Sequence, residues 1–222
     1  MHPPPQPAPS ERARIRRIPD RAVYERATIE AILDAGFVGY VAFVADGAPA
    51  LVPMVYTRIG DEVILHGSTA SRALRALVSG SEFCFSVTHV DGLVLARSAF
   101  HHTANYRSVV LHGRARAIVE EGEKRSILRA LVEGVIPGRS ADIRGPNAQE
   151  FAATSVVALP LDEAAAKVRS GGPVDLDEDR DLPAWAGVVP LALRSFSPIP
   201  ADDLDDGIER PAYVDAWGAR FA

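Results

Sequence analysis

The chain has 222 residues, with 24 lysines and arginines against 29 aspartates and glutamates, and 47% of it is hydrophobic. This length suits one large domain or two small ones, and the net charge of −5 argues against general nucleic-acid binding, which needs a basic excess. The single cysteine, Cys84, excludes an internal disulfide and a cysteine zinc cluster and fits a reducing cytoplasm. No apolar run approaches the roughly 20 residues of a membrane span. Composition therefore predicts a cytoplasmic globular protein that binds neither membranes nor nucleic acids.

The two ends of the chain differ in composition from its middle. Residues 1–16 begin with a proline-rich stretch and continue with several arginines, which predicts a disordered Pro/Arg-rich arm. Residues 201–222 are rich in aspartate and predict a C-terminal tail. We expect residues 17–200 to form a single domain.

A predicted helix opens this middle part. Asp20 is a suitable N-cap, and apolar residues at helical spacing follow it as far as Gly36. Residues 36–68 then alternate between apolar and polar and predict three strands. Their turns are expected at two dipeptides, Asp46-Gly47 and Gly60-Asp61. Pro49 and Pro53 in the middle strand favour edge positions or irregularities there.

Further strands alternate with two helices in the second half. The helices are predicted over Ala70–Val78, ending at Gly80, and over Glu120–Val135. The strands are predicted over Phe83–Val90 and Leu93–Ala96 around a turn at Asp91-Gly92, over Ser108–Val119, over Ser155–Leu161 and within residues 183–193. This spacing, with a short helix after the third strand, favours a small antiparallel barrel over a parallel sheet.

Residues 66–72, HGSTASR, lie where a strand is expected to run into a helix. Small residues let the backbone approach a ligand, and the hydroxyls of Ser68, Thr69 and Ser71 with the guanidinium of Arg72 suit a phosphate monoester. A serine-capped helix followed by an exposed arginine explains the same residues without a ligand. Local chemistry leaves both interpretations open.

A second polar segment, SAFHHTANYRS, covers residues 98–108. Its histidines, His101 and His102, and its tyrosine, Tyr106, are candidates for proton transfer or cofactor contact. Adjacent histidines on a strand point to opposite faces, and no HExxH, EF-hand or cysteine spacing indicates a metal centre, so no metal site is predicted. A single histidine as a haem axial ligand is compatible with this segment.

Three segments carry a resemblance to a known family: LHGSTASRALRAL, then FCFSVTHVDGLVLARSAFHHTANYRSVVLHGRARAI, then PAWAGVVPL. In this order they resemble the flavin-binding split-barrel superfamily of pyridoxamine-5′-phosphate-oxidase-like proteins, and most closely the branch that includes the nitroimidazole-resistance reductases. The likeness spans about Arg17 to Pro200. It implies a mainly β fold with helices, a six-stranded antiparallel split β-barrel, a homodimer, and FMN in the groove between the subunits.

The resemblance also implies the residues of the flavin site. The phosphate is expected where the third strand passes into the short helix, with a second contact from the strand that follows Tyr106. The middle strand of the first three is expected to run along the isoalloxazine ring, and a C-terminal segment with Trp185 to close the groove. The implied cofactor-binding residues are Val52, Pro53, Met54, His66, Gly67, Ser68, Ser71, Arg72, Arg107, Ser108 and Trp185. The candidate catalytic residues are His66, His101, His102 and Tyr106.

The predicted function is that of an FMN-dependent oxidoreductase or flavin reductase-like protein acting on a small molecule, with NADH or NADPH as electron donor. Where the oxidases have an Arg-Lys pair at the flavin phosphate, this chain has Ser71-Arg72, and the basic residues for a substrate phosphate have no counterpart. Oxidation of pyridoxamine phosphate is therefore not expected. Two alternatives are a haem-binding or haem-degrading split-barrel protein, with His101 or His102 as axial ligand, and a flavin-binding protein without turnover.

Overall fold

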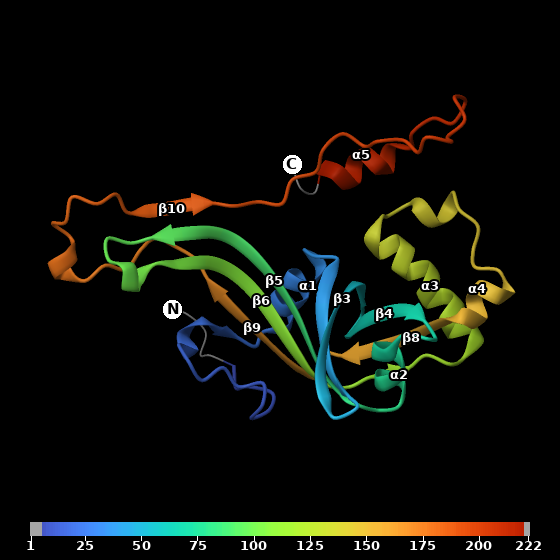
Figure 1. The fold of residues 1–222 in the computed structure, drawn as a ribbon, viewed down its shortest axis with the longest axis horizontal. Helices are drawn as coiled ribbons and strands as arrows, with labels where there is room; N and C mark the ends of the chain where they lie inside the picture. The colour runs from blue at the N-terminus through green and yellow to red at the C-terminus, as the bar shows by residue number, and fades with distance from the viewer. Residues whose placement is uncertain (1–5, 220–222) are drawn as a thin grey trace.

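A curved antiparallel sheet forms the centre of the molecule (Figure 1). The computed structural model describes residues 6–219, and within them the strand order is β1-β9-β6-β5-β2-β3-β4-β8-β7, with β10 paired to β5. The strands are β1 Ala22–Val23, β2 Val38–Ala45, β3 Ala48–Ile59, β4 Glu62–Ser68, β5 Glu82–Leu95, β6 Thr103–Arg114, β7 Arg116–Ala117, β8 Thr154–Pro160, β9 Glu163–Arg169 and β10 Gly187–Pro190. The predicted mainly antiparallel β class with few helices is confirmed, with ten strands in place of six.

The first three predicted strands are present as β2, β3 and β4. Asp46 and Gly47 both have positive φ, 53° and 76°, as a two-residue hairpin turn of type I′ requires. β3 pairs with β4 only over its last four residues, so its first part has a neighbour on one side alone. Counting outward from this turn, Pro49 and Pro53 occupy positions whose nitrogen points away from β2. The predicted edge placement of both prolines is therefore confirmed.

The predicted start of the first helix is wrong. Asp20 lies in a short 3-10 helix, Pro19–Arg21, and the α-helix α1 covers Arg26–Asp34 with Glu25 as N-cap. Between them, β1 pairs antiparallel with β9. β9 pairs with β6 on one side, and on its other side its backbone groups pair with β1. The backbone hydrogen bonds of residues 22–23 are therefore made to β9 and not within a longer helix.

The predicted turn at Asp91-Gly92 is also wrong. β5 runs straight through this dipeptide, and the register against β6 shifts by one residue there, which is a β-bulge. The bulge turns the Asp91 carboxylate towards Arg107, which donates two hydrogen bonds to it at 2.8 and 2.9 Å. The hairpin closes instead through a 3-10 turn, Ala99–His101. As a result β6 begins at Thr103, five residues before the predicted start.

The helices pack against the sheet, and two of them place side chains in its main core. The helices are α1, α2 Arg72–Val78, α3 Glu121–Val135, α4 Ala148–Ala153 and α5 Ala212–Gly218. The predicted helix over Glu120–Val135 is confirmed as α3, and the Glu120 carboxylate caps it by accepting from the backbone N–H groups of Gly122 and Glu123. No helix among residues 6–219 is long and apolar enough to cross a membrane.

Both ends of the chain contact the sheet domain. Residues 1–5 of the predicted arm lie outside the described residues; in the rest, Ser10 and Arg12 bond to Glu163, and Ala13 is buried. After β10 the tail crosses back towards α3 and ends in α5, as Figure 1 shows. Residues 220–222 of the predicted tail are likewise outside the described part. The tail thus connects the far end of the β5–β6 hairpin with the helical end of the molecule.

Candidate functional site: an apolar cavity under α3

An apolar cavity of about 380 Å³ lies between α3 and the sheet. Its lining is aliphatic except for one histidine, one threonine and one arginine. The lining residues are Val55, His66, Leu128, Leu131, Val132, Val135, Ile136, Arg139, Pro146 and Thr154. Concave, mostly apolar sites with a few polar groups are where small ligands and cofactors bind.

The position of α3 sets the roof of this cavity. Leu131 packs into a small core cluster with Ile64 of β4 and Val156 of β8, which anchors the helix to the sheet. One turn later Gly134 lies directly on β3, where an added Cβ would meet the Thr57 hydroxyl oxygen at 2.0 Å. The missing side chain therefore allows the close approach of α3 to β3.

His66 is the polar group on the sheet side of the cavity. Along β4 it follows Ile64 on the same face, by the period of two, and so faces α3. Its ring makes no hydrogen bond within residues 6–219, and Nδ1 is buried without a partner. Burial lowers the pKa of His66, so the ring is neutral at neutral pH. His66 is thus a neutral imidazole at the wall of an apolar cavity, without a hydrogen-bond partner among the described residues, and such a ring has the chemistry of a metal ligand.

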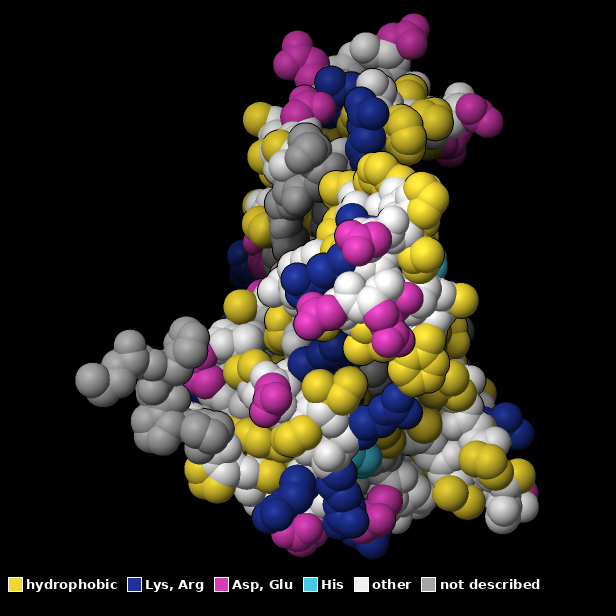
Figure 2. All heavy atoms as spheres, turned by 90° about the vertical axis from the view of Figure 1, so that its left-hand side faces the viewer, with side chains coloured by type: hydrophobic (Ala, Val, Ile, Leu, Met, Phe, Trp, Pro, Cys, Tyr) yellow, Lys and Arg dark blue, Asp and Glu magenta, His cyan; other side chains and the backbone are white. Residues whose placement is uncertain are grey.

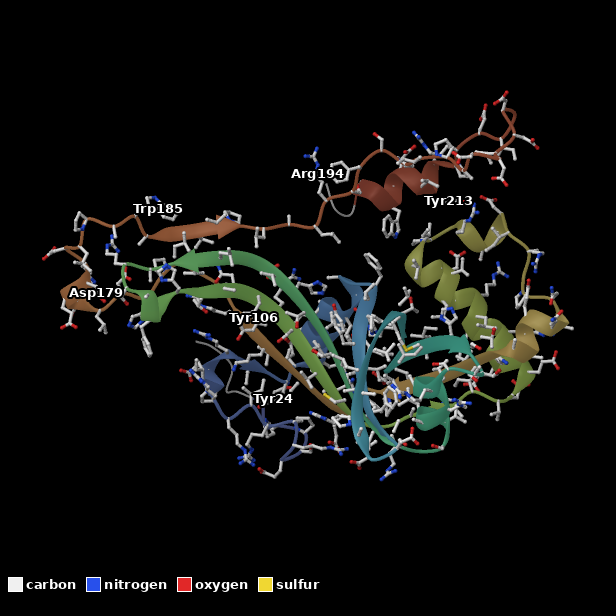
Figure 3. The ribbon with its side chains drawn as sticks, in the orientation of Figure 1. Tyr24, Tyr106, Asp179, Trp185, Arg194 and Tyr213 are labelled. Atoms are coloured by element: carbon white, nitrogen blue, oxygen red, sulfur yellow. The ribbon has the colours of Figure 1, made fainter. Side chains whose placement is uncertain are left out.

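Arg139 provides the charged group of the cavity. It begins the short 3-10 helix Arg139–Ala141, just after α3, and its guanidinium is exposed. It donates a hydrogen bond of 2.9 Å to the hydroxyl oxygen of Tyr213 on α5. Figure 3 shows Tyr213 on the last helix, above the end of α3. A residue far along the chain thus contacts the mouth of the cavity.

An exposed apolar sheet face continues from the cavity. Val55, which lines the cavity, is opposite Val38 across the β2–β3 ladder, and both are 40–42% exposed. Further along the same face Tyr40 is 49% and Leu51 63% exposed. Contiguous exposed apolar side chains on a sheet are typical of an interaction surface. We call this set (Val38, Tyr40, Leu51 and Val55) the apolar sheet face.

The predicted phosphate segment follows His66 directly. Ser71 caps α2 by accepting from the Leu74 N–H at 3.4 Å, and the Ser68 hydroxyl accepts from the Ala70 N–H at 3.1 Å. Arg72 is exposed and forms no ion pair within the described residues. Both hydroxyl oxygens thus accept from the backbone, and their hydrogens as well as the Arg72 guanidinium can still donate to a ligand.

The predicted flavin-ring segment lies on β3, which also supplies Val55 to the cavity. Val52 and Met54 point inward and pack against the main core, while Pro53 is exposed on the opposite face. Alternation along the strand therefore splits the predicted set. The side chain on the open side of the sheet is that of Pro53, and not those of Val52 and Met54. A ligand on this side would meet Pro53 and the backbone of β3.

The predicted contacts on β6 do not line the cavity under α3. β5, β2 and β3 separate β6 from β4 in the sheet order. Arg107 is paired with Asp91, which lowers the pKa of that carboxyl through the hydrogen bonds from the guanidinium. The Ser108 hydroxyl donates to the Lys167 carbonyl at 3.2 Å. Tyr106, half-buried, precedes them in the same strand.

His101, His102 and Trp185 lie at the opposite end of the molecule from α3. His101 packs edge-on against Phe100, which is 91% exposed, and exposed His102 interacts through Nδ1 with the Ser98 carbonyl. Trp185, 68% exposed, precedes β10 at the same end (Figure 3). This end of the molecule displays charged side chains of both signs beside hydrophobic ones (Figure 2). None of the three lines the cavity under α3, so a single chain does not bring all the predicted site residues together.

The family follows from sequence comparison. Residues 25–168 match the family model described as pyridoxamine 5′-phosphate oxidase. The chain belongs to this family. A search of curated proteins gives no match.

Two solved structures resemble the chain over nearly its whole length. The flavocytochrome Anf3 from Azotobacter vinelandii is 39% identical, with a TM-score of 0.91, covering 94% of this chain and 97% of its own. The FAD and heme binding protein from Mycobacterium smegmatis is also 39% identical, with a TM-score of 0.86, covering 89% of this chain and 97% of its own. A 5-nitroimidazole antibiotic resistance protein from Bacteroides thetaiotaomicron, 20% identical with a TM-score of 0.55, covers 66% of this chain and 86% of its own and shows a shared fold alone. The predicted split-barrel class and family are thereby confirmed.

The residues of α3 that line the cavity were not predicted from the sequence. The apolar residues of α3 recur at helical spacing, which predicts a face packed on the core, and Leu131 is indeed buried. Val132 and Val135 extend this stripe into the cavity. The only sequence signal for the cavity was that the apolar stripe of α3 is wider than its contact with the core requires. Such a stripe does not distinguish a cavity wall from a face packed on the core.

Proposed function

We propose that the chain is a flavin-dependent oxidoreductase that also binds haem, and that the cavity under α3 would hold the haem through the His66 imidazole. The observation that carries this proposal is the neutral, unpartnered ring of His66 in an aliphatic cavity. The descriptions of the two 39% identical structures, a flavocytochrome and an FAD and haem binding protein, support it.

The residues of the cavity fit a haem. Haem proteins need one axial side chain and an apolar pocket around the macrocycle, and both are present here. His66 replaces His101 and His102 as the proposed ligand because these two lie at the hairpin end, outside the apolar cavity. When bound, haem supplies one-electron chemistry, and a flavin links it to two-electron donors.

The flavin site is proposed on the open side of β3 next to Arg72. The cofactor is a flavin held by the free guanidinium of Arg72, with backbone groups of β3 along its ring. FAD is favoured over the FMN predicted from the sequence, because FAD is named for the 39% identical Mycobacterium smegmatis protein. We propose NADH or NADPH as the reductant, a small molecule as the acceptor, and the cytoplasm as the location, since Cys84 is the only cysteine.

We further propose that two chains form a homodimer through the apolar sheet face. Its exposed side chains lie beside the cavity, because Val55 belongs to both. A second copy covering this face would remove it from water and enclose the flavin between the subunits.

Cofactor binding is tested with the purified chain. Haemin titration is expected to give a Soret band at one equivalent per chain, and acid release of the flavin followed by chromatography identifies FAD or FMN. Reduction by NADH and NADPH under nitrogen then reports the electron donor. A chain that binds flavin but shows no Soret band under haemin would remove the haem part of the proposal and leave the flavin part standing.

Replacing Arg72 by alanine is expected to weaken flavin binding by roughly 1.5–3 kcal/mol, the range for a hydrogen bond to a charged group. Arg75→Ala, which removes an exposed arginine from the same helix one turn later, serves as the control. Fluorescence titration of the apoprotein with flavin measures both. Equal flavin affinity in the two variants would contradict the phosphate assignment.

Replacing Tyr40 by aspartate is expected to dissociate the homodimer, since it places a charge at the centre of the apolar sheet face without touching the core. Light scattering on a sizing column measures the mass. Val119→Asp, at a valine that is 84% exposed outside this face, should leave the dimer intact. A wild-type chain that is monomeric while it holds flavin would refute the interface.

A further inference from the structure

The C-terminal helix α5 is attached to the region around the cavity under α3 by four contacts. The Trp217 indole N–H donates to the Val135 carbonyl, and its ring lies 5.8 Å from that of Phe37. Tyr213 covers Gly138, whose φ is +93° and whose added Cβ would lie 3.1 Å from the tyrosine ring. The fourth contact is the hydrogen bond from Arg139 to the Tyr213 hydroxyl. The helix is thus held at the loop that follows α3.

The hydrogen bond to Tyr213 and, to a smaller extent, the charge of Asp142 raise the pKa of the Arg139 guanidinium. Arg139 forms no ion pair with a carboxylate among residues 6–219, although the acidic Glu133 lies in the preceding turn. The Glu133 carboxylate instead accepts from the backbone N–H groups of Gly138 and Ser140, at 2.7 and 2.8 Å, and holds the loop in shape. Tyr213 offers Arg139 its hydroxyl oxygen, 2.9 Å from the guanidinium. The guanidinium therefore keeps its full charge at the mouth of the cavity.

Of the described residues that line the cavity, Arg139 alone is permanently charged. A ligand that is apolar over most of its surface and anionic at one edge matches this distribution: aliphatic walls, a neutral histidine inside and an arginine at the mouth. Arg binds carboxylates with its planar fork of N–H donors, and such charge-assisted hydrogen bonds are about twice as strong as neutral ones.

We propose that Arg139 binds the propionate carboxylates of haem and that Tyr213, from α5, positions its guanidinium, so that the C-terminal helix is part of the haem site. This inference rests on the proposed haem binding. Tyr213 is a positioning residue here, because it touches Arg139 and acts through it. The first turn of α5 then contributes to the affinity of a cavity whose walls come from residues 55–154.

The test compares haemin with its dimethyl ester, in which both carboxylates are neutral. Each is titrated into the full-length wild-type chain and into Arg139→Gln, Arg139→Lys, Tyr213→Phe and Arg125→Gln, with the Soret band as readout. Arg125 lies on α3, pairs with Glu121 and does not line the cavity, so its variant is the matched charge control.

The wild-type chain is expected to bind haemin about tenfold or more tighter than the ester. Arg139→Gln should abolish this preference by weakening haemin binding alone, Arg139→Lys should restore part of it, and Tyr213→Phe should reduce it to a smaller extent. Arg125→Gln should behave as wild type. Loss of packing would lower the affinity for both ligands equally, so the preference ratio isolates the carboxylate contact.

Equal affinity of the wild-type chain for haemin and ester, or an equal loss of both in Arg139→Gln, would overturn this inference while leaving haem binding intact. An unchanged preference in Tyr213→Phe would overturn the role of α5. Binding of neither ligand by the wild-type chain would overturn the proposed haem function itself, and this inference with it.

Discussion

Replacing His66 by alanine is expected to abolish the Soret band in a haemin titration. The ring provides the axial nitrogen that we propose, and loss of a ligand costs more than the 10–100-fold in affinity that loss of a supporting group costs. We therefore expect the affinity to fall by more than about 100-fold. The folded state should tolerate the change, because the ring makes no hydrogen bond within the described residues and Nδ1 is buried without a partner.

The control for this variant is His102→Ala, which removes an exposed histidine at the hairpin end. It should bind haemin as the wild type does. Imidazole added to His66→Ala is expected to restore part of the Soret band by entering the space that the side chain leaves. Normal haemin binding by His66→Ala, or its loss in His102→Ala, would shift the ligand to the segment that the sequence first indicated.

Replacing Gly134 by alanine is expected to destabilise the fold by about 1–3 kcal/mol, the usual cost of overpacking. The new Cβ would lie 2.0, 2.8 and 2.9 Å from the Oγ1, Cγ2 and Cβ atoms of Thr57, so a side-chain rotation alone does not relieve the contact. The intrinsic preference of a helix for alanine over glycine, about 1 kcal/mol, acts in the opposite direction and is outweighed. Urea unfolding measures the change.

The double variant Gly134→Ala with Thr57→Ala separates this clash from a general effect of the helix. Removing Oγ1 and Cγ2 of Thr57 takes away the two nearest atoms, so the double variant should recover most of the stability that Gly134→Ala loses. Such coupling is expected only for residues in contact. A Gly134→Ala chain as stable as the wild type, with additive effects in the double variant, would show that α3 moves freely over β3.

The sequence predicted the hairpins well because their signals are local. Asp46-Gly47 needs positive φ at both residues, and few dipeptides adopt it, so the turn and the register of β2 and β3 follow together. Asp91-Gly92 carries the same signal, but the turn predicted there was wrong. The long ladders that β5 forms with β6 and β10 continue through this dipeptide, and a bulge takes the place of the turn. Residues 163–169, EAAAKVR, favour a helix by propensity, yet they form β9 between β1 and β6.

The candidate site could be predicted only in part. His66 was singled out because it adjoins the small and hydroxyl residues before α2, but its cavity depends on α3, which starts 55 residues later. The contact of Tyr213 with Arg139 spans 74 residues and has no periodicity or motif. Tertiary contacts of this kind bring together residues whose local patterns indicate only a helix or a loop.

The two prolines of β3 have a consequence for how the protein behaves when concentrated. Along the unpaired stretch of this strand, Pro49, Leu51, Pro53 and Val55 present their nitrogens outward, and the prolines have no hydrogen to donate. A strand from another chain would therefore find only half of the donors that a ladder requires. This edge is a poor template for fibril growth, which favours the face of the sheet over its rim for the homodimer proposed above.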